Sequence, residues 1–220
     1  MNAPEFEIES ISTAGRFTHR LIQSIVVVFT KVLWRQEVDG TERLPTGVPY
    51  VIAPVHRSYV DFLIVSAAVP RVQRFMAKDS VWKYPLGGRF LAFIGAFPVN
   101  RDAADRAAIR RCDDAIQGGD PIVMFPEGRR EHGPEVQELY HGPAWVACRN
   151  RVPIVPIAIG GSDRAMPKGA KMVYPARVRV LIGEPIYPDV VPTGHVPRRV
   201  VTELTATLHD EMQRLYDQVR

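Results

Sequence analysis

The sequence of 220 residues is poor in cysteine. Cys112 and Cys148 are its two cysteines, and both fall in segments with helical patterns, without the spacing of metal ligands. Two reduced, buried thiols in a cytosolic protein are the favoured interpretation, with a disulfide or a catalytic thiol as the alternatives. We therefore expect neither a disulfide framework nor a metal centre.

A secretory signal and a membrane-spanning run are also missing. The first fifteen residues contain three glutamates and lack the basic-then-apolar order of a signal peptide. The most apolar stretch, residues 21–34, is shorter than the roughly 20 apolar residues that cross a bilayer. Gln23, Ser24 and Lys31 interrupt it as well. The stretch therefore predicts no spanning helix.

Basic residues nonetheless flank this stretch, and Trp34 lies at its edge. The pattern is typical of a helix that lies in a membrane interface, with its cations toward the lipid headgroups. A helix packed on the protein's own core is the alternative. We expect residues 1–40 to form an N-terminal amphipathic segment able to contact a membrane, and residues 41–220 to form one folded domain.

The charge balance is mildly basic, with a formal net charge of +4. This excess favours anionic partners such as phosphorylated metabolites and acidic lipid surfaces. The basic residues are dispersed and lack the interleaved aromatic platform of a nucleic-acid-binding protein, so we expect no nucleic acid partner.

Apolar patterns of strand and helix length alternate along the chain, without repeats or interdomain linkers. This alternation predicts an α/β fold with a mixed, largely parallel central sheet flanked by helices. The expected helices cover residues 16–37, the stretch from the turn at His56 to residue 69, and residues 82–94, 103–117, 142–149 and 196–219. The expected strands end near residue 53 and cover residues 75–77, 96–99, 121–125, 154–159 and 178–182.

His56 and Asp61 stand five positions apart, directly after the first long apolar strand. On one helix they would lie about 140° apart, so they can meet only if His56 is on the turn before the helix. Ser58 is expected to cap that helix. A histidine held by a carboxylate at a strand-to-helix turn is a general-base arrangement. A structural contact is the alternative that the pair alone leaves open.

Charged residues follow other expected strands. Lys78 comes after residues 75–77, Arg101 after residues 96–99, and Glu127 after residues 121–125. Ligands of such sheets bind beyond the carboxyl ends of the strands, so we expect these groups to share one rim with His56.

The segment around Glu127 reads Phe-Pro-Glu-Gly-Arg-Arg. Pro126 prevents continuation of the sheet, and Gly128 permits a sharp turn or a close approach of a ligand. The guanidiniums of Arg129 and Arg130 have the donor geometry that binds phosphate. A surface ion-pair cluster at a strand end is the alternative.

In this order, these segments resemble the glycerol-phosphate and lysophosphatidic acid acyltransferase family. The resemblance covers about residues 50–160 and implies that family's α/β fold. Its four blocks are matched by His56 and Asp61; by Gly95 and Arg101; by Phe125, Pro126, Glu127, Gly128 and Arg130; and by Val152, Pro153, Ile154, Val155 and Pro156. Arg129 and Glu131 depart from the third block, which has threonine and serine there.

The resemblance implies transfer of a fatty acyl group from an acyl thioester, carried by coenzyme A or acyl carrier protein, to a hydroxyl of glycerol 3-phosphate or 1-acylglycerol 3-phosphate. His56 would act as the base and Asp61 would orient it. Arg101, Arg130, Lys78 and Gly128 would bind the acceptor phosphate. Glu127 would bind an acceptor hydroxyl or brace the arginines.

No Gly-x-Ser-x-Gly elbow is present, which favours direct attack over a covalent intermediate. We expect no cofactor beyond the acyl donor, and a cytoplasmic protein peripheral on the inner face of the cell membrane. The alternatives are an enzyme that acylates another lysophospholipid or a glycolipid, and a non-catalytic lipid-binding protein at the membrane surface. Thioester hydrolysis is disfavoured, because water would not need the arginines.

Overall fold

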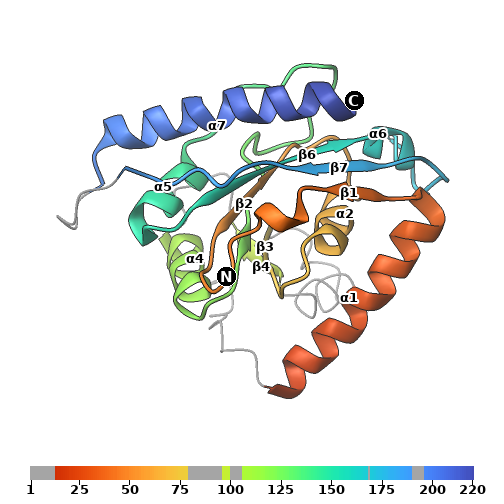
Figure 1. Cartoon of the computed structure of the whole chain (residues 1–220), viewed down its shortest axis with the longest axis horizontal. Helices are drawn as coiled ribbons and strands as arrows, with labels where there is room; N and C mark the ends of the chain where they lie inside the picture. The colour runs from red at the N-terminus through yellow and green to blue at the C-terminus, as the bar shows by residue number, and fades with distance from the viewer. Residues whose placement is uncertain (1–12, 79–95, 100–105, 168, 190–195) are drawn as a thin grey trace, which may run out of the picture.

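A mixed sheet of seven strands lies at the centre of the computed structural model, which describes residues 13–78, 96–99, 106–167, 169–189 and 196–220 (Figure 1). All neighbouring strands pair in parallel except β6 and β7, which are antiparallel. The expected sheet is therefore confirmed. In spatial order the strands are β1 (Glu37–Asp39), β7 (Arg179–Ile182), β6 (Ile154–Gly160), β2 (Val51–Pro54), β5 (Ile122–Val123), β3 (Arg74–Lys78) and β4 (Ala96–Val99).

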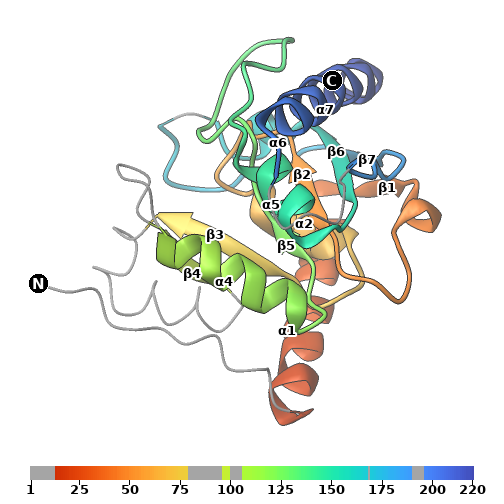
Figure 2. The same cartoon turned by 90° about the vertical axis from the view of Figure 1, so that its left-hand side faces the viewer.

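Helices cover both sides of the sheet. Figures 1 and 2 show α7 on one side and α1 on the other. Helix α7 packs on β6 and β7 and also contacts α5, which in turn contacts α4, while α1 packs against α2. The described helices are α1 (Thr13–Trp34), α2 (Asp61–Ala68), α4 (Arg106–Gln117), α5 (Gly142–Asn150), α6 (Ser162–Ala165) and α7 (Arg198–Val219), with a 3-10 turn at Thr41–Arg43. None of them combines the length and apolarity needed to span a membrane.

The middle of the sheet is the core of the fold. Every residue of β2 and β6 is buried, as expected for strands whose continuous apolar runs are covered on both faces. Cys112 and Cys148 are both free and buried, as expected of their thiols. Burial raises the pKa of the Cys148 thiol above its usual value.

Some sequence expectations differ from the structure. The first helix ends at Trp34 instead of residue 37, because Arg35 adopts a positive φ of 44° and the chain then enters β1. Strand β1 was not expected, since its three residues are polar or half-exposed and its partner β7 is remote in sequence. The short helix α6 was also missed. The helix expected over 82–94 lies outside the described residues.

Gly160 places β6 directly against the last turn of α7. A Cβ there would lie 1.9 Å from the carbonyl oxygen of Val219. Gly160→Ala should therefore displace the end of α7 and lower the free energy of unfolding by about 1–3 kcal/mol. Chemical denaturation measures this. The control is Gly142→Ala, where the new Cβ would meet only Met124 Cε at 3.8 Å. Equal denaturation midpoints for the two variants would contradict the prediction.

Candidate active site

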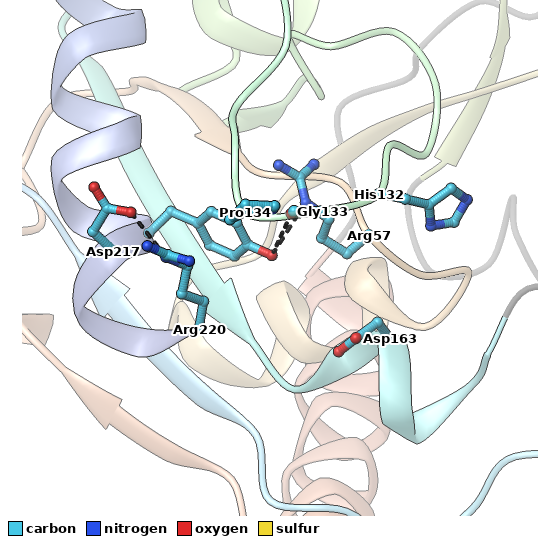
Figure 3. Close-up of a pocket in the computed structure, with 8 residues that line it drawn as sticks. Arg57, His132, Gly133, Pro134, Asp163, Asp217 and Arg220 are labelled. Atoms are coloured by element: carbon cyan, nitrogen blue, oxygen red, sulfur yellow. Dashed lines mark hydrogen bonds and ion pairs between the residues drawn. The ribbon is translucent and has the colours of Figure 1, made fainter.

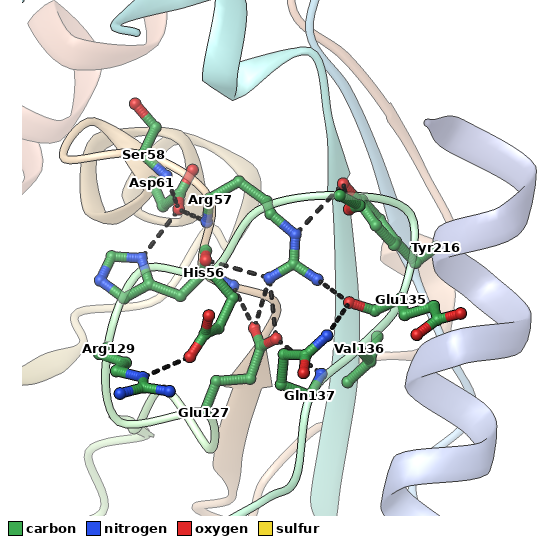
Figure 4. Close-up of polar contacts among 12 residues, drawn as sticks. His56, Arg57, Ser58, Asp61, Glu127, Arg129, Glu135, Val136, Gln137 and Tyr216 are labelled. Carbon is green, nitrogen blue, oxygen red and sulfur yellow. Dashed lines mark hydrogen bonds and ion pairs between the residues drawn. The ribbon is translucent and has the colours of Figure 1, made fainter. Parts of the chain in front are cut away.

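The turn between β2 and α2 brings His56 and Asp61 together (Figure 4). His56 Nδ1 lies 2.9 Å from Asp61 Oδ2, and the same oxygen accepts the backbone N–H groups of Arg57 and Ser58, both at 2.7 Å. Asp61 is fully buried and is the first residue of α2. One carboxylate oxygen therefore holds the turn and the imidazole at once, with His56 before the helix as expected.

Ser58 does not cap α2, so that expectation is wrong. The N-cap position is Val60, which makes no side-chain capping bond. The hydroxyl of Ser58 instead donates to the carbonyl oxygen of Met166 at 3.0 Å. The carboxylate of Asp61 already accepts the loop N–H groups, so the serine is used to tie the turn to the chain after α6.

Two contacts orient the imidazole ring of His56: the hydrogen bond from Nδ1 to Asp61 and a stack on Phe125. The ring stacks on Phe125 with centroids 4.1 Å apart, and 14% of the side chain is exposed. A carboxylate only accepts hydrogen bonds, so the bond to Asp61 places a proton on Nδ1 of the neutral ring. Nε2 then presents a lone pair, and it has no hydrogen-bond partner within the described part of the chain. This is the arrangement that proton abstraction requires.

Behind the histidine lies a buried ion pair between Arg57 and Glu127. Nη1 of Arg57 lies 2.8 and 2.7 Å from the two oxygens of Glu127, and the side chains are 3% and 0% exposed. Glu127 also accepts the backbone N–H groups of His56 at 2.9 Å and Gln137 at 3.1 Å. Burial acts to lower the pKa of Arg57, but the charge and hydrogen bonds of Glu127 outweigh it and raise that pKa.

Arg57 connects three parts of the fold, and sequence reasoning missed it. Its Nη2 donates to the carbonyl oxygen of Glu135 at 3.0 Å, its Nε donates to the hydroxyl of Tyr216 at 3.2 Å, and its Cζ lies 4.7 Å from the Tyr216 ring centre. An arginine between two motif residues looks like an exposed loop cation. One signal in the sequence could have found it: a carboxylate that directly follows a buried strand, as Glu127 does, needs a cationic partner if it is buried itself.

Glu127 was expected to bind an acceptor hydroxyl or to brace the phosphate-binding arginines, and the structure shows it bonded to another arginine, Arg57. Each of its described contacts is to the protein itself. Arg129 points away, being 80% exposed and paired with Glu131.

Arg130 contacts the histidine turn. Its Cζ sits 3.2 Å from the ring centre of Tyr59, a residue of that turn, which is a cation–π contact. Gly128 has a φ of 67°, and a Cβ there would lie 2.6 Å from the Tyr140 ring, so only glycine fits. Lys78 ends β3 at the same rim. Its side chain and all of Arg101 lie outside the described part of the structure.

Two hollows adjoin this network. An apolar one of about 350 Å³ lies next to Phe125 and Gly128; Met76, Val99, Met124, Tyr140, Gly142 and Pro143 complete its lining. A polar one of about 500 Å³ lies on the α7 side of Arg57 (Figure 3). Within the described ranges no three His, Cys, Asp or Glu side chains are grouped to hold a metal ion.

Comparison with known proteins places this geometry in a family. The family model described as "Acyltransferase" matches residues 35–160, which is more than half of the chain. The chain belongs to this acyltransferase family. The match includes the turn at His56 and the segment at Glu127, so the resemblance seen in the sequence is confirmed.

Several named relatives are 1-acyl-sn-glycerol-3-phosphate acyltransferases. The chloroplastic protein BAT2 of Brassica napus is 26% identical over 78% of this chain and 51% of its own length. The Bacillus subtilis protein is 26% identical over 81% of this chain and 87% of its own length. This chain thus spans about half of the chloroplastic relative but most of the bacterial one.

A solved structure shares the fold. The 1-acyl-sn-glycerophosphate acyltransferase PlsC from Thermotoga maritima superposes with a TM-score of 0.74 at 22% identity. The superposition covers 91% of this chain and 80% of that one. The likeness confirms the expected acyltransferase fold.

Removing one member of the buried pair should leave an unpaired buried charge. We expect Arg57→Met to lower the free energy of unfolding by about 3–5 kcal/mol. The control is Arg199→Met, whose ion pair with Glu203 is exposed and should contribute about 0–1 kcal/mol. Denaturant unfolding of both variants measures the difference. A loss for Arg57→Met no larger than that of the control would show that the pair does not hold the site together.

Proposed function

We propose that this protein transfers an acyl group from an acyl thioester to a hydroxyl of 1-acylglycerol 3-phosphate or glycerol 3-phosphate. The observation that carries the proposal is the His56–Asp61 pair and its surroundings. The His56 ring stacks on Phe125, which lines the apolar hollow, and Tyr59 of the same turn holds the cation of Arg130. A lipid acceptor needs all three: a base, a place for a chain and a charge for its phosphate. The names of the relatives support the substrate class.

In the proposed reaction, His56 Nε2 takes the proton of the acceptor hydroxyl as that oxygen attacks the thioester carbonyl carbon. The carbon–sulfur bond then breaks, and the imidazolium returns the proton to the leaving thiolate of coenzyme A or acyl carrier protein. Asp61 stabilises the imidazolium and holds its tautomer. Such proton transfer contributes about 10²–10⁴-fold to the rate, and a thioester requires no covalent enzyme intermediate.

Arg130 is the proposed phosphate ligand that the structure describes best. Tyr59 holds its guanidinium beside the histidine turn, and Gly128 supplies the positive φ of the backbone turn two residues before it. Lys78 and Arg101 remain proposed ligands from the sequence pattern. Glu127 has a positioning role in this proposal, since it accepts a hydrogen bond from the backbone N–H of His56. The apolar hollow is the proposed site of the acyl chain, because methionines in its lining adapt readily to flexible chains.

Helix α1 is the proposed membrane contact, because its polar side faces the protein. Gln23 is buried and donates to the carbonyl oxygens of Ser66 and Val69 in and after α2. The opposite face is apolar and exposed, at the spacing of one helix side. It consists of Leu21, Ile25, Val28, Phe29 and Val32. This favours the interfacial interpretation over a helix whose apolar face packs on its own core, and we place the protein at the cytoplasmic face of the membrane.

The function is tested by product analysis. Purified protein is given a palmitoyl thioester with glycerol 3-phosphate or with 1-acylglycerol 3-phosphate, and mass spectrometry identifies the product. We expect an acylated phospholipid precursor, and His56→Ala should lower the rate by about 10²–10⁴-fold. The control His132→Ala removes an exposed histidine and should keep the rate. No product with either acceptor would overturn the proposal and leave the non-catalytic lipid-binding alternative.

Arg129 and Arg130 offer a matched pair for the phosphate role. Arg130→Ala should lower kcat/KM for the phosphorylated acceptor by roughly 10–100-fold, since a hydrogen bond to a charged group is worth about 1.5–3 kcal/mol. It should leave the rate with an unphosphorylated monoacylglycerol unchanged. Arg129→Ala should stay near wild type, because that side chain is exposed and paired with Glu131. Equal losses with both acceptors would contradict a phosphate-binding role.

A further inference from the structure

We propose that residues 166, 167 and 169–177, here called the rim segment, form a second membrane contact beside α1 and bind the anionic headgroup layer of a lipid bilayer. The rim segment connects α6 to β7. The inference rests on the proposed function in that it assigns a surface by which the same site would reach a lipid acceptor.

The first support is exposure of consecutive apolar side chains. Met172 is 70% exposed, Val173 36% and Tyr174 50%. Single exposed apolar residues are common on soluble proteins, but a contiguous group marks an interaction surface. Tyrosine is also enriched where lipid and water meet. The rim segment therefore presents an apolar tip that its own fold leaves uncovered.

The second support is charge. From Arg164 to Gly183 the sequence contains lysines and arginines but neither aspartate nor glutamate. Residues 10–36, which include α1, are likewise free of acidic residues and contain several basic ones. Each Lys or Arg near an anionic leaflet is attracted by about 1 kcal/mol. A surface with exposed apolar groups and only positive charges fits an anionic bilayer. A protein partner would usually present both positive and negative charges, so it fits less well.

The third support is a direct connection between the two surfaces. The indole N–H of Trp34, at the end of α1, donates to the carbonyl oxygen of Tyr174 at 3.1 Å. The backbone N–H of Val178 donates to the carbonyl oxygen of Trp34 at 3.0 Å. Figure 1 shows the end of α1 on the same side of the molecule as α6, where the rim segment begins. The rim segment therefore lies next to the C-terminal end of α1, where Val32 is 76% exposed.

The fourth support is the position of the active-site turn. Ser58 Oγ donates to the carbonyl oxygen of Met166, the first residue of the rim segment. A bilayer bound to the rim segment would therefore lie beside the turn that holds His56. An acceptor could then reach the base without leaving the lipid surface completely.

Vesicle sedimentation tests the inference. Wild type is compared with the rim variant Met172→Ser/Tyr174→Ser, the α1 variant Ile25→Ser/Val28→Ser, and the control Tyr187→Ser. Tyr187 is 68% exposed but follows Ile186, which pairs with Ile154 at the opposite end of β6 from the rim segment. Vesicles contain phosphatidylcholine with or without phosphatidylglycerol. All substituted side chains are exposed, so thermal unfolding should match wild type and show that folding is intact.

We expect the rim variant and the α1 variant each to weaken binding to phosphatidylglycerol vesicles by roughly tenfold or more, and the control to bind as wild type. Lys171→Glu should weaken binding to phosphatidylglycerol vesicles without changing binding to phosphatidylcholine. Wild-type binding by the rim variant, alongside a loss in the α1 variant, would overturn the inference. Absence of vesicle binding by wild type would overturn both membrane contacts.

An activity assay separates this inference from the proposed function. With short-chain, water-soluble substrates the rim variant should be as fast as wild type, and with acceptor embedded in vesicles it should be slower by about the same factor as its loss of binding. Equal rates with the embedded acceptor would count against the rim segment. Absence of product from wild type in both assays would overturn the proposed function, while the sedimentation result would still decide the surface.

Discussion

The buried ion pair of Arg57 and Glu127 is the interaction on which the site depends. A charge in this position costs several kcal/mol unless a partner and hydrogen bonds compensate it. Compensation here needs the turn after β2, the segment from Glu127 to Gln137, and Tyr216 of α7 in place together. The site is therefore assembled only when distant parts of the chain have folded, and it is held rigidly once they have.

His56 gains its orientation from this frame. Glu127 fixes its backbone N–H, Asp61 fixes Nδ1, and Phe125 covers one face of the ring. Each neighbour is itself buried or hydrogen-bonded, so little freedom remains to be lost when substrate arrives. Such preorganisation is how positioning lowers a barrier. In the proposed reaction it leaves Nε2 as the one ring atom directed to chemistry.

Helix α1 reverses the usual arrangement of an amphipathic helix. Gln23 and Thr30 face the protein, while Ile25 and Val32 face outward. The buried amide of Gln23 is tolerated because carbonyl groups at the end of α2 accept its hydrogens. The apolar side chains of the outer face are unfavourably exposed in water, whereas a lipid surface would bury them. The same reasoning applies to the rim segment, which is hydrogen-bonded both to the end of α1 and to the active-site turn.

Much of the fold could be predicted from local patterns in the chain. The continuous apolar runs of β2 and β6 specify buried strands, and the five-residue spacing of His56 and Asp61 requires a turn before a helix. These features depend on neighbouring residues alone. The expectation for Ser58 failed because a local preference for capping cannot account for a remote acceptor, the carbonyl oxygen of Met166.

The sequence by itself therefore determined the strands other than β1, most helices, and the pair that forms the candidate base. Only the tertiary structure decided that Arg57 is buried, because its partner Glu127 is 70 positions away. Only the structure decided which side of α1 faces outward, since periodicity identifies two faces but not which one the protein covers. The physical reason is the same in both cases: burial is a property of the assembled chain, set by contacts between segments that are distant in the sequence.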